Sequence, residues 1–236
     1  MTVVGTIERH AVLTADECAA VGRLVRDARK RWILRSAEWP FYTLGAASYI
    51  DARAGERPYR ALARLHNPWL RQAFGWLYRR VGAVLAARLG APVQVTEQAA
   101  VPGFHVYQAC PAFETPVASI HCDRQYALIG WDDGPAPDLA HPLSFTLPVS
   151  VPRSGAGLDV WDLPLAAVEG LGHEAFSRLV GERRPARHAY ALGELVVHDG
   201  HLVHRAAPST DLQPDDERVT LQGHGLRRGT TWEIYW

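Results

Sequence analysis

The second half of the sequence is divided into short runs of β-favouring residues, and this pattern restricts the fold more than any other feature. From Val93 onward, Gly, Pro and Asp separate these runs. Such punctuation is typical of antiparallel strands in a β-barrel or β-sandwich. We expect strands at 104–108, 118–129, 143–151, 158–162, 192–198, 201–206 and 218–223. The stretch 169–179 instead indicates a short helix inside a loop.

The first 92 residues have helical periodicity. Thr14-Ala-Asp-Glu17 has the pattern of a capping box, and apolar residues then recur every three or four positions, which predicts a helix over 15–33. A second helix is expected to begin at Asn67-Pro68 and to end at Gly90, with a strand at 42–51 between the two. Because no repeat or Gly/Ser/Pro-rich linker divides the chain, we expect one domain over 1–236, with 1–92 as helical support and 93–236 as the β core.

Composition narrows the class of protein and of partner. The 236 residues are 47% hydrophobic, enough for a core without disulfides. The 25 Lys and Arg residues balance 25 Asp and Glu residues, which argues against nucleic acid or an anionic membrane as the main partner and favours a small molecule. No apolar run approaches the ~20 residues of a membrane span, and the N-terminus lacks the regions of a signal peptide.

The cysteine and lysine residues exclude further classes. Cys18, Cys110 and Cys122 are odd in number and form no Cys-x-x-Cys pair, which argues against a zinc ribbon or a disulfide framework and favours the cytoplasm. Lys30, the only lysine, stands between two arginines in a helical stretch, where we expect it to face water. Schiff-base chemistry therefore has no candidate residue. The oligomeric state stays open.

Two stretches carry candidate metal ligands. In the expected strand 118–129, His121 and Asp123 are two residues apart, so their side chains share one face. The later stretch 193–208 reads as strand, Asp-Gly turn and strand, and it offers His198, His201 and His204 as a third ligand. Two histidines and one carboxylate on one side of an octahedral ion leave three positions open, as non-haem Fe(II) requires for a bidentate co-substrate and O2.

Together these motifs resemble the Fe(II)/2-oxoglutarate-dependent oxygenase superfamily, in particular its prolyl-hydroxylase-like and phytanoyl-hydroxylase-like branches. The resemblance rests on His121-x-Asp123, on the stretch from Gly193 to Arg205, and on Arg218-Val-Thr-Leu. It covers roughly residues 93–225 as a skeleton of motifs and reaches the helical N-terminus only in general layout.

The resemblance implies a fold, a cofactor set and residue roles. The fold is a double-stranded β-helix (jelly-roll, cupin-like), here mainly β with N-terminal helices. Fe(II) is held by His121, Asp123 and His204, and 2-oxoglutarate, consumed with O2, is held at its far carboxylate by Arg218. Asp123 fills a position that is Gly or Ala in halogenating relatives, so we expect hydroxylation of an amino acid or secondary metabolite, with oxidative cyclisation, desaturation or epoxidation as variants.

Other candidate site residues follow from their positions. Tyr107 or Gln108 is expected to contact 2-oxoglutarate. Gln125 shares parity with the two ligands, and Arg124 and Tyr126 flank it, so these three are candidate substrate contacts. Trp161 is a fourth candidate, among the aromatic residues expected to line a small pocket.

Each assignment has a structural alternative. His121 and Asp123 fit a surface ion pair, Arg218 fits an ion pair with Asp216 or Glu217, and His224 and Cys122 fit buried core positions. A cupin-like metal protein that uses the three histidines of 198–204 without 2-oxoglutarate is the main enzymatic alternative, although strand parity disfavours it. A β-barrel binding module without turnover is the non-enzymatic alternative.

Overall fold

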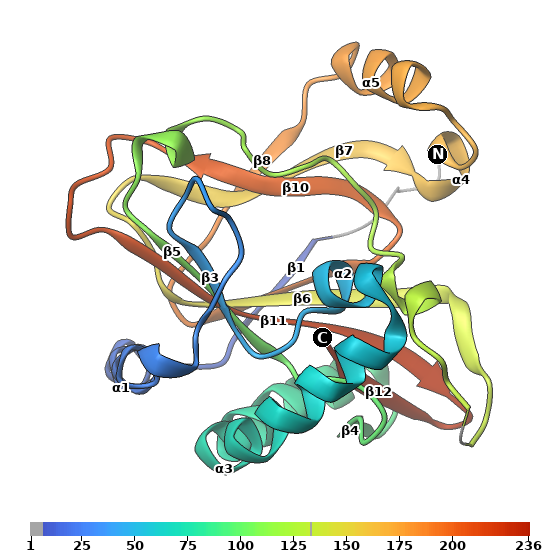
Figure 1. Ribbon diagram of the computed structural model, residues 1–236. Helices are drawn as coiled ribbons and strands as arrows, with labels where there is room; N and C mark the ends of the chain where they lie inside the picture. Colours follow the sequence, from blue (N-terminus) through green and yellow to red (C-terminus); the bar gives the residue numbers. More distant parts are fainter. Residues whose placement is uncertain (1–6, 133) are drawn as a thin grey trace.

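Two sheets, one large and one small, face each other in the computed structural model, which describes residues 7–132 and 134–236 (Figure 1). The larger sheet is antiparallel except for the parallel β4–β12 pair. Its strands, in spatial order, are β1 (Glu8–Ala11), β9 (Glu194–Asp199), β6 (Pro137–Ser150), β11 (Glu217–Arg228), β5 (Gly103–Gln108), β3 (Phe41–Leu44) and β2 (Ile33–Leu34). In addition, β12 (Thr231–Tyr235) pairs with β11, and β4 (Val93–Val95) pairs with β12. The smaller sheet holds β10 (Leu202–Ser209), β7 (Gly155–Pro164) and β8 (Ala186–Ala189).

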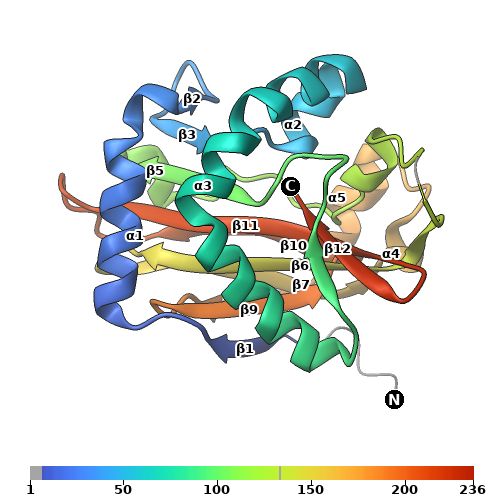
Figure 2. The same ribbon diagram turned by 90° about the horizontal axis from the view of Figure 1, so that it is seen from below.

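Two helices cover the outer face of the larger sheet, α1 (Ala15–Asp27) and α3 (Glu56–Leu89). Figure 2 shows both lying across this face. Their apolar side chains share one buried cluster with alternate residues of β5, β6, β9 and β11, among them Phe104, Phe145, Leu195 and Leu221. Packing of this kind makes the outer face of the sheet the main hydrophobic core.

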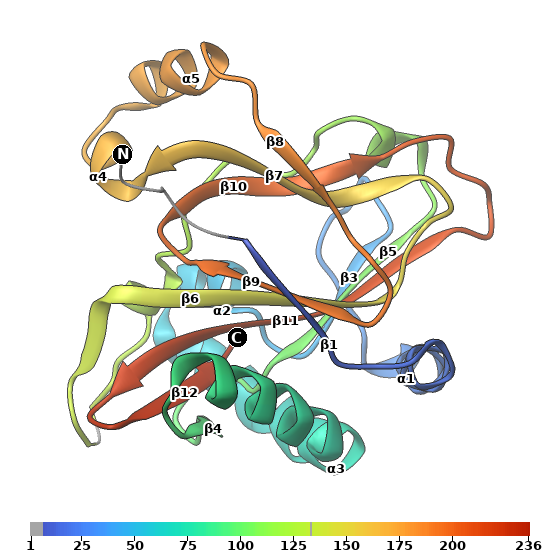
Figure 3. The same ribbon diagram turned by 180° about the vertical axis from the view of Figure 1, so that it is seen from behind.

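The short helices α4 (Leu165–Val168) and α5 (His173–Gly181) cover the outer face of the smaller sheet, as Figure 3 shows from behind. A second apolar cluster forms beneath them, with Trp161, Leu163 and Val203. Both sheets therefore bury apolar side chains on the outside, under helices. Because side chains alternate along a strand, the other set of residues points into the space between the sheets.

That inner face is polar along β11. Arg218, Thr220, Gln222 and His224 alternate with Val219, Leu221 and other residues of the helix-facing core. β6 contributes Ser144 and Thr146, which lie opposite His224 and Gln222 in the strand register. A polar interior between two sheets is a natural place for a buried site rather than for a core.

The architecture is the expected sheet-rich jelly roll with helical support. The capping box at Thr14 is present, with Glu17 N–H donating to Thr14 Oγ1 at 3.3 Å and Thr14 N–H donating to Glu17 Oε2 at 2.9 Å. Gly90 ends α3 in a left-handed conformation, with φ 61°. Within the described residues no helix is long and apolar enough to cross a membrane.

Three expected elements are wrong in extent. The first helix ends at Asp27 and continues only as the 3₁₀ turn η1 (Arg29–Arg31). The strand expected over 42–51 is β3 followed by the short helix α2 (Ser48–Asp51) and the 3₁₀ turn η2 (Ala52–Ala54). The helix expected to begin at Asn67-Pro68 begins at Glu56, and Pro68 lies inside it. Burial of Tyr59 and Ala63 before the proline and of Leu70 and Phe74 after it explains why α3 continues despite the lost hydrogen bond.

The strand expected over 118–129 is also wrong. The chain there forms one isolated bridge at His121 and then the 3₁₀ turn η4 (Gln125–Leu128). This irregular segment lies beside β10, to which the bridge joins it.

Candidate functional site

A single β-bridge joins the two histidines of the expected ligand set. His121 N–H donates to His204 O at 2.9 Å, and His204 N–H donates to His121 O at 2.9 Å. This reciprocal pair fixes the irregular segment to β10, and the two rings lie 4.6 Å apart between centroids. The bridge brings together residues that are 83 positions apart in the sequence (204 minus 121).

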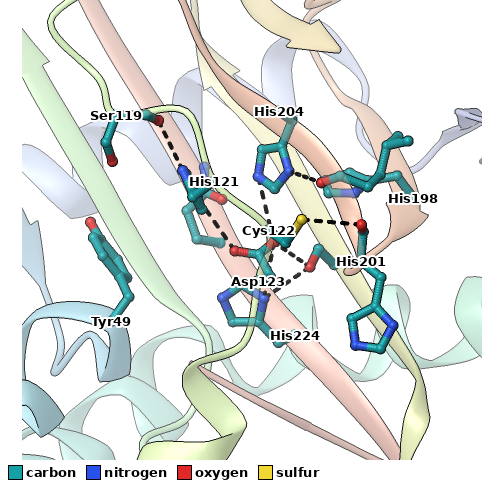
Figure 4. Close-up of polar contacts among 12 residues, drawn as sticks. Tyr49, Ser119, His121, Cys122, Asp123, His198, His201, His204 and His224 are labelled. Atoms are coloured by element: carbon teal, nitrogen blue, oxygen red, sulfur yellow. Dashed lines mark hydrogen bonds and ion pairs between the residues drawn. The ribbon is translucent and has the colours of Figure 1, made fainter. Parts of the chain in front are cut away.

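Asp123 completes the cluster from the same segment. Its N–H donates to Gly200 O at 2.7 Å, so the turn between β9 and β10 holds its backbone. Asp123 Oδ1 lies 3.5 Å from His121 Nε2, and Oδ2 lies 3.5 Å from His204 Nε2 (Figure 4). Asp123 is 7% exposed, so it is not half of a surface ion pair.

Both histidines are oriented by the backbone carbonyl two residues before them. His121 Nδ1 lies 2.9 Å from Ser119 O, and His204 Nδ1 lies 2.8 Å from Leu202 O. Because a carbonyl oxygen only accepts, each Nδ1 carries the proton and each neutral ring keeps its lone pair on Nε2. Metal-binding histidines have this arrangement, with the second nitrogen fixed by a hydrogen bond.

The donor set fits one first-row metal ion. One ligand atom from each of His121, Asp123 and His204 lies within 4.8 Å of the other two. Metal–ligand bonds of about 2.1 Å place ligand atoms about 3 to 4 Å apart, close to the separations here. Three protein ligands leave the remaining positions of an octahedral ion for other molecules. The side chain of His121 is 42% exposed, so the site opens to solvent beside this residue.

Electrostatics favour an ionised aspartate beside neutral imidazoles at His204 and His224. Burial opposes ionisation of Asp123, but His204, His224 and His121 outweigh it and hold its pKa well below the ordinary value. Burial lowers the pKa of His204 to about 3 and that of His224 to about 4. Burial also opposes protonation of His121, but its contacts with Asp123 raise its pKa above the ordinary value. A carboxylate and available imidazole lone pairs are the ionic forms that a metal ion binds.

The other candidate histidines have separate partners. His201 Nε2 lies 2.8 Å from the Tyr126 hydroxyl, and its ring is directed away from Asp123 in Figure 4. The His198 ring lies 4.7 Å from that of His204, but His198 is not in the ligand group. His224 Nδ1 lies 3.0 Å from Ser144 Oγ, as expected for a buried hydrogen-bonding residue. Cys122 Sγ donates to His201 O at 3.2 Å.

Arg218 lies farther along the same interior. Its Nη1 donates to Ala207 O at 3.1 Å, and its guanidinium lies 4.0 Å from the ring centre of Tyr107. Ala207 is three residues after His204 on β10, which corresponds to about 10 Å along a strand. Arg218 is 9% exposed and makes no ion pair with a described residue. Asp216 and Glu217, its proposed surface partners, instead pair with Arg153 and Arg26.

A cleft next to Arg218 is lined by Tyr107, Gln108, Phe113 and Ala207. Between this cleft and Asp123, polar side chains of β6 and β11 are hydrogen-bonded to one another. Thr146 Oγ1 donates to Gln222 Oε1 at 2.9 Å, and Gln222 Nε2 donates to Thr220 Oγ1 at 2.9 Å. The interior is therefore polar from the His–Asp–His group to the arginine.

Solved structures share this architecture. The non-heme alpha-ketoglutarate-dependent epimerase SnoN from nogalamycin biosynthesis matches with a TM-score of 0.55 and 14% identity, over 95% of this chain and 81% of that one. A novel N-substituted L-amino acid dioxygenase from Burkholderia ambifaria AMMD, in complex with alpha-KG, matches with a TM-score of 0.56 and 14% identity, over 98% and 86%. The carbocyclase SnoK, also alpha-ketoglutarate-dependent, matches with a TM-score of 0.56 and 12% identity, over 95% and 83%. The chain has the fold of the 2-oxoglutarate-dependent oxygenases. No protein-family model and no curated protein matches the sequence.

The four residues expected to contact substrate in this oxygenase fold are dispersed. Arg124 Nη2 pairs with Glu169 at 3.0 Å. Gln125 is 6% exposed, and its Nε2 has no hydrogen-bond partner among the described residues. Tyr126 packs in an apolar cluster with Tyr59 and Leu226.

Trp161, which was expected to line the pocket, lies on the opposite face of its sheet. It is in the cluster beneath α4 and α5, on the outer face of the smaller sheet. The alternation of β7 explains this, because Val160, its neighbour, is the residue that pairs with His204. The interior of the oxygenase fold therefore receives Val160 and not Trp161.

Two site residues were missed by the sequence analysis. Ser144 Oγ donates to Asp123 Oδ2 at 2.6 Å. The alternation Leu143-Ser144-Phe145-Thr146-Leu147 could have indicated that Ser144 faces the interior, because its neighbours are apolar. Tyr49 on α2, which Figure 4 draws on the His121 side of the site, has no comparable signal in the sequence.

Proposed function

We propose that this chain is an Fe(II)- and 2-oxoglutarate-dependent oxygenase that oxidises a small molecule. The observation that carries the proposal is the convergence of two Nε2 atoms and one carboxylate, with both Nδ1 atoms already bound to backbone carbonyls. Two imidazoles and one carboxylate with open positions are typical of oxygenases with non-haem Fe(II). His121, Asp123 and His204 would hold the ion.

Arg218 is the proposed anchor for 2-oxoglutarate. Its guanidinium is buried, lies on the inner face of the larger sheet and has no carboxylate partner among the residues described. A planar guanidinium binds a carboxylate through two parallel hydrogen bonds. Tyr107, beneath the guanidinium, and Gln108, at the cleft, are the proposed further contacts.

Bound iron would couple the oxidative decarboxylation of 2-oxoglutarate by O2, with release of succinate and CO2, to oxidation of the substrate. Hydroxylation is the proposed outcome, because Asp123 occupies the position that halogenating relatives leave open. The carbocyclase activity named for SnoK supports oxidative cyclisation as an alternative on the same fold. Desaturation and epoxidation are the other proposed alternatives. Free amino acids or secondary metabolites are the proposed substrates, and the cytoplasm is the proposed location.

A cupin-like metal protein without 2-oxoglutarate is the weaker alternative. It would require the three histidines of 198–204 to converge on one ion. The hydrogen bond between His201 and Tyr126 argues against that arrangement. Arg218 also favours the oxygenase function. It has no carboxylate partner among the described residues, and a bound keto acid would supply one, whereas a metal protein without 2-oxoglutarate would leave this buried cation without a carboxylate.

The test is anaerobic titration of the purified protein with Fe(II) and then 2-oxoglutarate. We expect the weak visible charge-transfer band of the chelate to appear in the wild type and to be lost in His121→Ala and in Asp123→Ala. His141→Ala, which removes an exposed histidine, is the matched control and should keep the band. A full-strength band in either ligand variant would contradict the assignment.

Arg218→Ala separates the two cofactors. This variant should need far more 2-oxoglutarate for the same band while binding nearly as much Fe(II) as the wild type, because the arginine contacts the keto acid and not the ion. An unchanged 2-oxoglutarate requirement would remove Arg218 from its proposed role.

A further inference from the structure

Phe41, Tyr107 and Arg218 form one row across three neighbouring strands of the larger sheet. In the strand register, Phe41 of β3 lies opposite Tyr107 of β5, and Tyr107 lies opposite Arg218 of β11. β3, β5 and β11 are consecutive in the sheet (Figure 2). Because residues directly opposite each other project to the same face of a sheet, the row belongs to the inner face that carries Arg218.

The Tyr107 ring lies between the other two side chains of this row. It is stacked on the Phe41 ring, with 4.3 Å between the ring centroids and 13° between the ring planes. The Arg218 guanidinium lies 4.0 Å from the centre of the same ring. Two groups at these distances cannot share one face of a six-membered ring, so Phe41 covers one face of Tyr107 and the guanidinium covers the other.

Phe113 supports the edge of the Tyr107 ring. The two centroids are 5.1 Å apart, and the ring planes are nearly perpendicular, at 86°. Phe113 belongs to the 3₁₀ turn η3 (Pro111–Glu114) and is 6% exposed. Stacked and edge-on contacts are both favourable arrangements of aromatic rings. Two rings from different parts of the chain therefore hold in place the ring that contacts the guanidinium.

Tyr107 attracts Arg218 as a neutral ring. Burial raises the pKa of Tyr107 more than the charge of Arg218 lowers it, so the phenol keeps its proton near pH 7. The face of such a ring binds a guanidinium most strongly away from water, and Arg218 is 9% exposed. Arg218 Nη1 also donates to Ala207 O of the smaller sheet at 3.1 Å. One ring and one carbonyl, from the two sheets, thus fix the guanidinium.

A guanidinium in a fixed position limits which keto acid can bind. A keto acid chelated to an ion at His121, Asp123 and His204 is held at one end, and its far carboxylate must meet Arg218 at the other. If the guanidinium cannot move, a chain that is longer by one methylene group loses part of this contact. If the support of the Tyr107 ring is removed, the guanidinium can follow the longer chain.

We propose that Phe41, through the stacked Tyr107 ring, fixes the position of Arg218 and so restricts the site to keto diacids of one chain length. The proposal rests on the oxygenase function above and on Arg218 as the anchor of the keto acid. Phe41 is a positioning residue, because it acts on the keto acid through Tyr107 and Arg218.

The experiment compares 2-oxoglutarate with 2-oxoadipate, which is longer by one methylene group. Protein saturated with Fe(II) is titrated anaerobically with each acid, and the charge-transfer band gives both affinities without turnover. We expect the wild type to prefer 2-oxoglutarate about tenfold, as one methylene group predicts. Phe41→Leu should bind 2-oxoglutarate about threefold more weakly, because the stacking is lost, and its preference should fall to about threefold.

Tyr42→Leu is the matched control. Tyr42 is the next residue on β3, and its ring packs on the outer face, 5.4 Å from that of Trp32. This variant should keep the wild-type affinity and preference. Phe41→Tyr keeps the stacked ring and should restore the preference that Phe41→Leu loses.

Two further measurements separate positioning from a general loss of structure. All variants should bind as much Fe(II) as the wild type and have unchanged circular dichroism, because the row contacts none of the three expected ligands. Phe113→Leu removes the edge-on contact from a different element and should also reduce the preference, so the proposal is tested even if Phe41→Leu does not fold.

Equal binding of the two acids by the wild type, an unchanged preference in Phe41→Leu and Phe113→Leu, or equal effects of the Phe41→Leu and Tyr42→Leu substitutions would overturn the role of Phe41. Failure of the oxygenase proposal gives a different result, since the charge-transfer band would then be missing in the wild type with either acid.

Discussion

The carboxylate of Asp123 is held by the protein before any ion binds. Ser144 Oγ donates to its Oδ2 at 2.6 Å, and His224 Nδ1, 3.0 Å from the same hydroxyl, lies 3.7 Å from that oxygen. Ser144 therefore connects two strands of the larger sheet to a ligand on an irregular segment. Partners of this kind fix the direction of a ligand and strengthen metal binding.

Removing the Ser144 hydroxyl should weaken iron binding without unfolding the protein. We expect Ser144→Ala to lower the Fe(II) affinity roughly tenfold, the lower end of the effect of such partners. Competition with a coloured chelator under anaerobic conditions measures it. Ser150→Ala is the control on the same strand, because its hydroxyl contacts Glu217 O at 3.4 Å and not Asp123. Equal affinities of the two variants would contradict the role of Ser144.

His66 should make the protein less stable in acid. It is 6% exposed, and burial lowers its pKa below the ordinary value of 6.5. Above pH 6.5 both the folded and the unfolded chain keep it neutral. Below this pH the unfolded chain takes up a proton that the folded chain binds more weakly, so stability is lost as the pH falls.

Urea unfolding at about pH 7.5 and about pH 5.5 tests this dependence. The free energy of unfolding of the wild type should fall more on acidification than that of His66→Gln. His141→Gln, at an exposed position, should behave like the wild type. Parallel curves for the wild type and the His66 variant would show that this residue binds protons equally in both states.

At the scale of elements, local signals predicted some segments and tertiary contacts decided others. The capping box and Gly90 are local chemistry, so the start of α1 and the end of α3 could be read from sequence. Asn67-Pro68 also looked like a helix start. The Asn67 side chain, however, does not cap a helix: its Nδ2 donates to Ala99 O, and its Oδ1 accepts from Val101 N–H. Pro68 lies between two buried stretches of one helix.

The candidate ligands were found for a partly mistaken reason. Strand parity was used to place His121 and Asp123 on one face, whereas only one bridge forms there. What brings them together is the backbone contact of each with the β10 strand or its preceding turn, which depends on distant residues. On β10, Val203 lies in the apolar cluster beneath α4 and α5, so its side chain and that of His204 lie on opposite faces, although the strand register shifts between Leu202 and His204.

The capping box gives a prediction for α1. Thr14→Ala removes the acceptor for Glu17 N–H and should lower the free energy of unfolding by about 1 kcal/mol. Denaturant unfolding measures the loss. Thr14→Ser keeps the hydroxyl and should recover most of the stability, whereas an equal loss in both variants would rule out the cap as the cause.

At the scale of the molecule, one residue links the helical layer to the sheet. Trp236 is 0% exposed, its N–H donates to Ala100 O at 2.8 Å, and its carbonyl accepts from the Tyr59 hydroxyl of α3 at 2.7 Å. A Cβ on Gly103 of β5 would lie 2.3 Å from its ring, so the close approach requires glycine there. α3, β5 and the end of the chain thus form one packed unit.

Trp236→Ala should therefore destabilise the whole protein. We expect a loss of about 3 to 5 kcal/mol, as for other large buried side chains, seen as a single lowered unfolding transition. Leu65→Ala, at a position that is 67% exposed, is the control and should change little. A small effect of the tryptophan substitution would show that the Trp236 ring is not needed for α3 and β5 to pack together.

The reciprocal bridge between His121 and His204 has a consequence for how the protein responds to its ion. Backbone hydrogen bonds to His204 and Gly200 hold the segment that bears His121 and Asp123. The next residue, Arg124, is exposed. An ion bound by all three side chains would cross-link this segment to β10 of the smaller sheet. Trypsin should then cut after Arg124 more slowly once iron is added, so that digestion reports occupancy without any turnover.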